Sequence, residues 1–176
     1  MTVVTLLRVD DALVGGLNSS VRRSPPAASA VGRLAAGLAG VERLLMVALA
    51  LAGRRDSAVR MLAAVGLVYL LSDALGAIWP RQRPFARLSQ VEALATHSPE
   101  RSFPSRHVAS ALAMAAVGGR AHHRLGTAMA TVGWVLGVSR VAAGLHYPSD
   151  VIGGALLGAG VGWLSQPVGP ARRRRS

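Results

Sequence analysis

The stretch MLAAVGLVYLLSDALGAIW, residues 61–79, decides the fold class of this chain. Its 19 residues contain a single charged side chain, Asp73. A helix of about 20 apolar residues crosses the hydrocarbon core of a bilayer, which is about 30 Å thick. The apolar residues do not alternate with period two, so a strand is not expected. The stretch is therefore predicted to be a membrane-spanning helix.

Further apolar runs lie on both sides of this stretch, and they are residues 34–53, 108–119, 125–139 and 151–166. The run 108–119 has only 12 residues, so its helix is expected to extend into the flanking polar residues. The predicted fold is therefore all-α, an integral membrane bundle of about five transmembrane helices. It is expected to form a single domain over residues 1–170, followed by a basic tail over 171–176.

The composition supports a membrane protein. Hydrophobic residues make up 51% of the 176 residues and charged residues 16%, whereas a soluble domain is about one quarter charged. This apolar content excludes a disordered chain, and the absence of cysteine excludes disulfides and cysteine-ligated metals. The net charge of +12 would suit nucleic acid, but five apolar spans make a nucleic-acid partner unexpected. The basic tail is instead expected to contact anionic membrane lipids.

The N-terminal segment, residues 1–30, has a different pattern. Apolar residues on one face of a helix over residues 2–17 leave Arg8, Asp10 and Asp11 on another face. This pattern is typical of a short amphipathic helix that lies in the membrane interface. Ser24-Pro25-Pro26 then interrupts the chain before the first span.

Counting turns assigns the chain ends and loops to two sides of the membrane. The loops near Arg54 and Arg120, with the tail, hold nine arginines on one side, and the other side holds six on the segments between its spans, plus those of the N-terminal segment if it lies there. Arginines used for chemistry would explain those on the second side, so the first side is predicted to be cytoplasmic.

Small residues follow a regular spacing in the last span, at Gly154, Gly158 and Gly162. Glycines four residues apart allow two helices to approach closely. Packing within the chain is the favoured interpretation, and a homodimer interface is the alternative.

Three polar clusters are expected on the non-cytoplasmic side. They are residues 81–85 after the second span, residues 102–107 before the third, and residues 139–150 between the fourth and fifth. They hold arginine forks suited to phosphate oxygens, two histidines with acid, base or nucleophilic capacity near neutral pH, and a carboxylate four residues after one histidine. The phosphate-binding candidates are Arg83, Arg106 and Arg140, and the catalytic candidates are His107, His146 and Asp150. Together they indicate phosphoryl transfer through a histidine nucleophile.

These motifs resemble the three signatures of the type 2 phosphatidic acid phosphatase (PAP2) superfamily. The third, Ser139-Arg140-x5-His146-x3-Asp150, is complete. The second, Ser105-Arg106-His107, has arginine where the family usually has glycine, and the first has Gly76 where the family usually has lysine. Together with His97, these departures resemble the bacitracin-resistance branch, whose members dephosphorylate undecaprenyl diphosphate.

The resemblance implies a role for each matching residue. His146 would be the nucleophile that forms a phosphohistidine, Asp150 would orient it, and His107 would protonate the leaving group and later activate water. The phosphoryl oxygens would be held by Arg83, Arg140, Ser105 and the backbone amides of Arg106 and His107. The resemblance also implies no metal or other cofactor, a bacterial cytoplasmic membrane location, and a site at the extracytoplasmic face with a cytoplasmic tail.

Accessory roles are expected for three further residues. Arg81 is a candidate substitute for the missing lysine, and His97 is expected to contact the second phosphate of a diphosphate, gate the pocket or cap its loop. Asp73 is expected to pair with an arginine such as Arg140 or Arg83, or to serve in function, because intramembrane carboxylates are costly.

The function expected from the sequence is therefore hydrolysis of an isoprenyl diphosphate in carrier-lipid recycling for cell-wall synthesis. The alternative substrates are glycerolipid phosphates, such as phosphatidylglycerophosphate or phosphatidic acid, and other prenyl phosphates. A different class of function is a catalytically degenerate protein that binds or translocates lipid, which Gly76 and Arg106 motivate.

Overall fold

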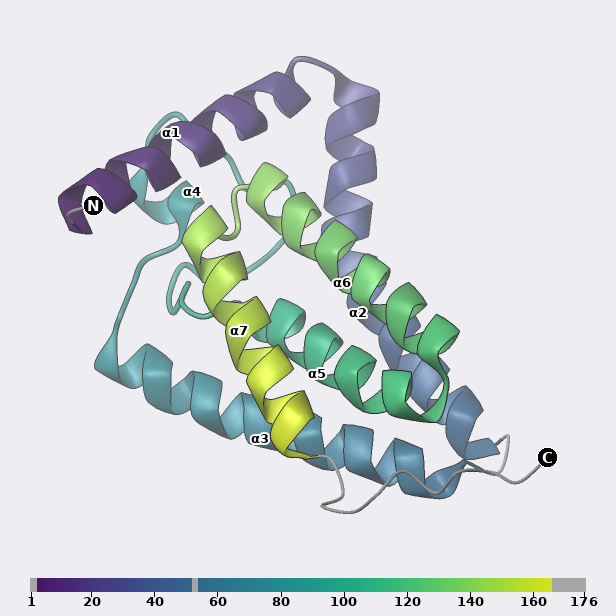
Figure 1. Ribbon diagram of the computed structural model, residues 1–176. Coiled ribbons are helices and arrows are strands. Elements are labelled where there is room, and N and C mark those ends of the chain that lie inside the picture. The colour runs from purple at the N-terminus through teal and green to yellow at the C-terminus, as the bar shows by residue number, and fades with distance from the viewer. Residues whose placement is uncertain (1–2, 52–53, 166–176) are drawn as a thin grey trace.

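The computed structural model describes residues 3–51 and 54–165, and every regular element in these ranges is a helix (Figure 1). The elements are α1 (Val3–Arg22), α2 (Pro25–Leu51), α3 (Arg55–Ile78), α4 (Pro84–Arg87), α5 (Arg106–Ala121), α6 (His123–Ala142) and α7 (Pro148–Leu164). The predicted all-α class is confirmed. The basic tail, 171–176, lies outside the described residues.

The five predicted spans correspond to α2, α3, α5, α6 and α7. The prediction that the run 108–119 extends into polar flanks is correct, because α5 begins at Arg106. The predicted break at Ser24 is also present, and α2 begins at Pro25, earlier than the predicted start at residue 34. Proline is favoured in the first helical turn, since its missing N–H has no acceptor there.

The outer surface of the bundle is apolar. By length and composition, α3 and α6 are sufficient to cross a membrane, whereas α5 and α7 have 16 and 17 residues. Large apolar side chains face outward along the helices, among them Leu44, Leu62, Leu70, Ile78, Val138, Leu156 and Leu164. Such a surface is stable in hydrocarbon rather than in water.

The centre of the bundle is α5, which packs against α3, α6 and α7. A Cβ atom at Gly158 would lie 2.1 Å from the carbonyl oxygen of Ala109 in α5, so only glycine permits this approach. Gly154 and Gly162 meet α5 in the same way, at Ser105 and Ala113. The face formed by Gly154, Gly158 and Gly162 thus packs against α5, and packing within the chain, the favoured interpretation of their spacing, is present.

Helix α1 lies across the end of the bundle where α6 ends and α7 begins (Figure 1). As predicted, its polar residues lie on a different face from its leucines. The polar face packs against the protein, whereas in a simple surface helix it would face solvent. Asp10 and Asn18 are buried against the protein, whereas Leu6, Leu13 and Leu17 are exposed. The amide of Asn18 donates to the carbonyl oxygens of Ala142, at 2.9 Å, and Glu92, at 3.0 Å. Polar contacts therefore attach α1 to the bundle, and its leucines remain exposed.

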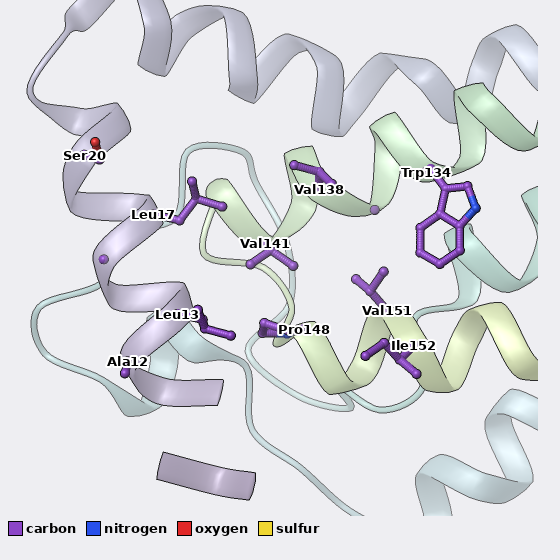
Figure 2. A pocket seen from close by; sticks show the side chains of 12 residues that line it. Ala12, Leu13, Leu17, Ser20, Trp134, Val138, Val141, Pro148, Val151 and Ile152 are labelled. Carbon is purple, nitrogen blue, oxygen red and sulfur yellow. The ribbon is translucent and has the colours of Figure 1, made fainter. Parts of the chain in front are cut away.

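An apolar groove of about 630 Å³ runs between α1, α6 and α7. Figure 2 shows Leu13 and Leu17 of α1 on one side, with Val138 and Val141 of α6 and Ile152 of α7 on the other. The groove continues the apolar outer surface up to α1, as expected for a helix at the membrane interface.

The connection between α6 and α7 turns sharply at Gly144, whose φ is +72°. A Cβ atom there would lie 2.7 Å from Val91 Cγ1 and 2.8 Å from the carbonyl oxygen of Glu92. Glycine alone combines this conformation with this close approach. The turn lets the loop that follows α4 pack against the α6–α7 connection, where the backbone N–H of Leu94 donates to Ala143 at 3.0 Å.

Candidate active site

The three polar clusters meet at one end of the bundle, as the count of turns predicted. The backbone N–H of Ser105 donates to the carbonyl oxygen of Asp150 at 3.0 Å, which joins the starts of α5 and α7. The guanidinium of Arg83, just before α4, donates to the carbonyl oxygen of Leu145 at 2.8 Å. Segments far apart in the sequence thus form one site.

His146 and Asp150 form a pair across the start of α7. Nδ1 of His146 lies 3.6 Å from Oδ2 of Asp150, and the two side chains are 2% and 0% exposed. Helix α7 begins at Pro148, so Asp150 lies in its first turn and His146 lies two residues before the helix. The first turn brings the Asp150 carboxylate back beside the His146 ring. The same carboxylate oxygen accepts the backbone N–H of Tyr147 at 2.8 Å, which holds the carboxylate beside the imidazole.

Two further donors hold the Asp150 carboxylate. The hydroxyl of Ser102 donates to Oδ2, and Nη1 of Arg81 donates to Oδ1 at 2.9 Å. Hydrogen bonds and a neighbouring cation favour the ionised form of a buried carboxylate. The contact of Ser102 with Asp150 was not predicted from the sequence.

Arg83 contacts the ring of His146. Its Nη1 atom lies 3.0 Å from Nε2 and 3.5 Å from Nδ1. Because a guanidinium only donates hydrogen bonds, Nε2 is assigned as the acceptor and the ring proton is placed on Nδ1, toward Asp150. In this tautomer Nε2 carries the lone pair of the ring, and Nη1 of Arg83 lies against the ring beside it.

Several buried donors in this cluster have no hydrogen-bond partner. Among the described side chains there are seven such buried polar atoms, and five belong to the predicted site: Arg83 Nε, His97 Nδ1, Ser105 Oγ, Arg140 Nε and Arg140 Nη2. Arg140 is 2% exposed, and its Nη1 donates to the carbonyl oxygen of Ala35 at 2.9 Å. An unsatisfied buried polar group costs about 1–3 kcal/mol. Two buried arginines with unused donors suit an oxyanion that accepts from both.

Ser105 occupies the N-cap position of α5, but its hydroxyl makes no capping hydrogen bond. The hydroxyl of Ser105 makes no hydrogen bond, which suits the phosphate-binding role that the resemblance implies for it. The backbone N–H groups of Arg106 and His107 belong to the first helical turn, where no carbonyl within the helix accepts them. Together with the helix dipole they favour an anion at this end of α5.

Burial controls the protonation of the loop residues in the site. Desolvation lowers the pKa of His146 to about 4, although Asp150 opposes the shift, and it lowers the pKa of His97 to about 4, with Arg83 adding to the effect. Desolvation also lowers the pKa of Arg83, to about 10. At neutral pH both imidazoles are therefore neutral and the guanidinium is charged, which is the state that a nucleophile beside an anion site requires.

His97 lies near both of the other two histidines of the site. Its ring centroid is 6.4 Å from those of both His107 and His146. His97 and His107 are half-buried, whereas Arg83, Arg140 and His146 are buried. The accessible side of the site is therefore the side of these two histidines.

Three predicted residues have other partners. The guanidinium of Arg106 points to α3, where it pairs with Asp73 at 3.1 Å and lies 5.5 Å from the ring centre of Tyr69. Only the backbone of Arg106 is therefore at the anion site. Asp73 pairs with Arg106 on an exposed surface, not with Arg140 or Arg83 as expected. The reason is that the side chain of Arg106 leaves α5 toward α3, where Asp73 is half-exposed.

Arg81 is the candidate substitute for the lysine that the family usually has at the position of Gly76, but its guanidinium is already paired. Its two terminal nitrogens pair with Asp150 at 2.9 Å and with Asp10 of α1 at 2.8 Å. The contribution of Asp10 was not predicted, because α1 is distant in sequence from every motif. The signal in the sequence that could have found Asp10 is its place, with Asn18, among the polar residues of an amphipathic helix.

The family model of the PAP2 superfamily matches residues 57–174. The bacitracin transport permease protein BcrC of Bacillus licheniformis is 34% identical over 89 residues, which are 51% of this chain and 44% of that protein. The undecaprenyl-diphosphatase BcrC of Bacillus subtilis (strain 168) is 31% identical over 124 residues, which are 69% of this chain and 64% of that protein. The matches thus span less than two thirds of these curated relatives.

Two solved structures share the fold. LpxE of Aquifex aeolicus has a TM-score of 0.72 and 27% identity, covering 87% of this chain and 92% of that one. The transmembrane PAP2 type phosphatidylglycerolphosphate phosphatase of Bacillus subtilis has a TM-score of 0.70 and 22% identity, covering 92% of this chain and 84% of that one. The chain is an integral membrane helix bundle, and it belongs to the PAP2 superfamily.

Proposed function

We propose that this protein is a membrane phosphatase that hydrolyses an isoprenyl diphosphate, such as undecaprenyl diphosphate, to the monophosphate and inorganic phosphate. The observation that carries the proposal is the contact of the buried His146–Asp150 pair with Arg83, beside the unpartnered donors of Arg140. A neutral imidazole next to an oxyanion site has the parts needed for phosphoryl transfer through nitrogen.

In the first half-reaction, Nε2 of His146 attacks the terminal phosphorus while the bond to the bridging oxygen breaks. His107 gives its proton to that oxygen, and the lipid monophosphate leaves. The imidazole of His146 becomes positively charged as the phosphohistidine forms, and the Asp150 carboxylate stabilises this charge. Arg83 and Arg140 stabilise the negative charge on the phosphoryl oxygens.

In the second half-reaction, His107 accepts a proton from water as the water oxygen attacks phosphorus. The bond between phosphorus and Nε2 breaks, inorganic phosphate leaves, and the lone pair returns to His146. The proton that His107 gave away is thereby replaced, so the cycle closes without a net change in the enzyme.

The diphosphate is favoured over a single phosphate by the relative from Bacillus subtilis and by His97. The ring of His97, 6.4 Å from those of both His107 and His146, supports a contact to a second phosphate. A glycerolipid phosphate or another prenyl phosphate is the second candidate, favoured by the fold shared with a phosphatidylglycerolphosphate phosphatase. The proposal includes an extracytoplasmic site and a cytoplasmic tail, as the resemblance to the family implies.

The test is phosphate release by detergent-purified protein in the presence of a chelator, with undecaprenyl diphosphate, phosphatidylglycerophosphate and phosphatidic acid as substrates. The matched controls are His146→Ala and His123→Ala, the second at an exposed position at the other end of the bundle. Rapid quenching with labelled substrate should trap an acid-labile phosphohistidine in the parent and not in His146→Ala. Turnover that survives His146→Ala would contradict the mechanism, and binding without turnover would favour a lipid-binding protein.

A further inference from the structure

A buried chain of charges connects the N-terminal helix to the candidate nucleophile. Asp10 of α1 accepts Nη2 of Arg81 at 2.8 Å, and Nη1 of Arg81 donates to Asp150 at 2.9 Å. The side chains of Asp10, Arg81 and Asp150 are 5%, 14% and 0% exposed. One guanidinium is thus shared between a carboxylate of the site and a carboxylate from outside the three PAP2 motifs.

Asp10 also holds the helix that carries Asp150. Its Oδ1 accepts the backbone N–H of Ser149 at 3.1 Å, and its Oδ2 accepts the hydroxyl of Ser149. The guanidinium of Arg81 lies 3.7 Å from the ring centre of Tyr147 and donates to Ser149 at 2.7 Å. The position of Arg81 is therefore determined by α1 and by the first turn of α7 together.

This arrangement affects the charge next to His146. Arg81 alone would neutralise Asp150, whereas with Asp10 the three groups carry a net charge of −1. In a site of low dielectric, one unit of charge changes the stability of a nearby cation strongly. The other charged groups that face His146 are the cations Arg83 and Arg140, so the negative charge that stabilises an imidazolium there comes from this chain.

We propose that Asp10 is a positioning residue that acts through Arg81 to keep Asp150 available to His146. This inference rests on the proposed function of His146 as the nucleophile. Helix α1 then contributes to the site. The Asp10 carboxylate balances the charge of Arg81, so the negative charge of Asp150 remains available to stabilise the phosphohistidine.

The test compares Asp10→Asn with Asp11→Asn. Asp11 is a matched control because it lies on the same helix and pairs with an arginine, Arg87, but on an exposed surface without contact to Asp150. In metal sites, losing the partner that orients a ligand costs about 10–100-fold, and a loss of the same order is expected here. Asp10→Asn should lower kcat at least tenfold with KM changed less than twofold, and Asp11→Asn should change kcat less than twofold. Equal effects of the two changes would overturn the proposal.

A double-mutant cycle identifies the route. If Asp10 acts through Arg81, then Asp10→Asn should have less than a twofold effect on kcat in an Arg81→Gln background. An undiminished effect in that background would overturn the proposed route. Detergent-gel filtration and the thermal midpoint of each variant separate a loss of positioning from a loss of folding.

A measurement that does not depend on turnover tests the role of Asp10 separately from the phosphatase activity. In 15N-histidine NMR spectra, with His146→Ala to assign the signals, Asp10→Asn should lower the pKa of His146, because Arg81 would then cancel the charge of Asp150. Asp11→Asn should leave it unchanged. A shift without turnover in the parent would retain the positioning role and reject the phosphatase, whereas turnover without a shift would reject the positioning role.

Discussion

Nη1 of Arg83 lies 3.0 Å from Nε2 and 3.5 Å from Nδ1 of His146, so the guanidinium lies against the imidazole ring, next to the nitrogen proposed to attack. A phosphoryl oxygen is a better acceptor for an arginine than a neutral imidazole, since both partners are then charged. A bound phosphate that accepts from Arg83 would therefore lie next to Nε2 of His146. In the proposed mechanism, the same contact brings the phosphorus and the attacking nitrogen together.

Asp150→Asn is expected to reduce kcat by about 10³–10⁴, because the amide cannot stabilise the charged imidazole and favours the wrong tautomer. The shape of the side chain is retained, so the hydrogen bonds from Ser102 and Tyr147 have an acceptor and the protein should fold. Initial rates with the preferred lipid phosphate measure the effect. Asp56→Asn, at an exposed position at the other end of α3, is the control. A rate within tenfold of the parent would contradict the orienting role.

Arg140→Lys is expected to lower kcat/KM by about 10²–10³, because an ammonium cannot reproduce the planar fork that reaches Ala35 and the anion site together. Steady-state kinetics in detergent measure this loss. Arg124→Lys, an exposed change in the same helix, should leave kcat/KM unchanged. Full activity of Arg140→Lys would show that the charge alone suffices.

His97→Ala is expected to distinguish a diphosphate from a monophosphate. If His97 contacts the second phosphate, its loss should raise KM for an isoprenyl diphosphate about tenfold, the cost of one hydrogen bond to a charged group. The KM for the corresponding monophosphate should stay within twofold. Thr96→Ala, at the exposed neighbouring position, is the control. Equal effects on both substrates would assign His97 to the loop and not to the ligand.

The acid limb of the pH profile should lie well below the usual range of histidine. Burial lowers the pKa of His146 from 6.5 to about 4, and protonation removes the lone pair that attacks phosphorus. The value of kcat/KM should therefore fall as the pH falls through about 4, and not through 6.5. Rates measured between pH 3.5 and 7, with tryptophan fluorescence to confirm folding at each pH, test this. A midpoint near 6.5 in folded protein would show that His146 titrates as an exposed imidazole.

Two glycines of α7 should respond in opposite directions. A Cβ atom at Gly158 would lie 2.1 Å from the carbonyl oxygen of Ala109, whereas nothing lies within 4 Å of one at Gly160. Gly158→Ala is expected to destabilise the fold by about 1–3 kcal/mol through overpacking. Gly160→Ala is expected to stabilise it by about 0.5–1 kcal/mol, because alanine favours the helix. Thermal midpoints in detergent measure both, and similar midpoints would contradict the close approach of α5 and α7.

The helices could be predicted from the sequence because each apolar run is long and interrupted by few charges. The extension of α5 to Arg106 followed from the same argument, since a run of 12 residues is too short to span. The direction in which α1 faces could not be predicted. Its polar stripe fits an interfacial helix in either orientation, and the buried partners of Asp10 and Asn18 lie about 70 or more residues away in sequence.

The sequence by itself determined the class of the fold and the chemical types at the site, because hydrophobic length and motif spacing are local properties. It also indicated that His146 and Asp150 form a pair, since four residues are one helical turn. Only the tertiary structure decided which arginines face the anion site. The guanidinium of Arg106 turns to Asp73 and that of Arg81 is shared by Asp10 and Asp150, whereas Arg83 and Arg140 retain unpaired donors. All four side chains have the same chemistry, and their roles differ because each guanidinium pairs with the acceptor that folding brings within reach.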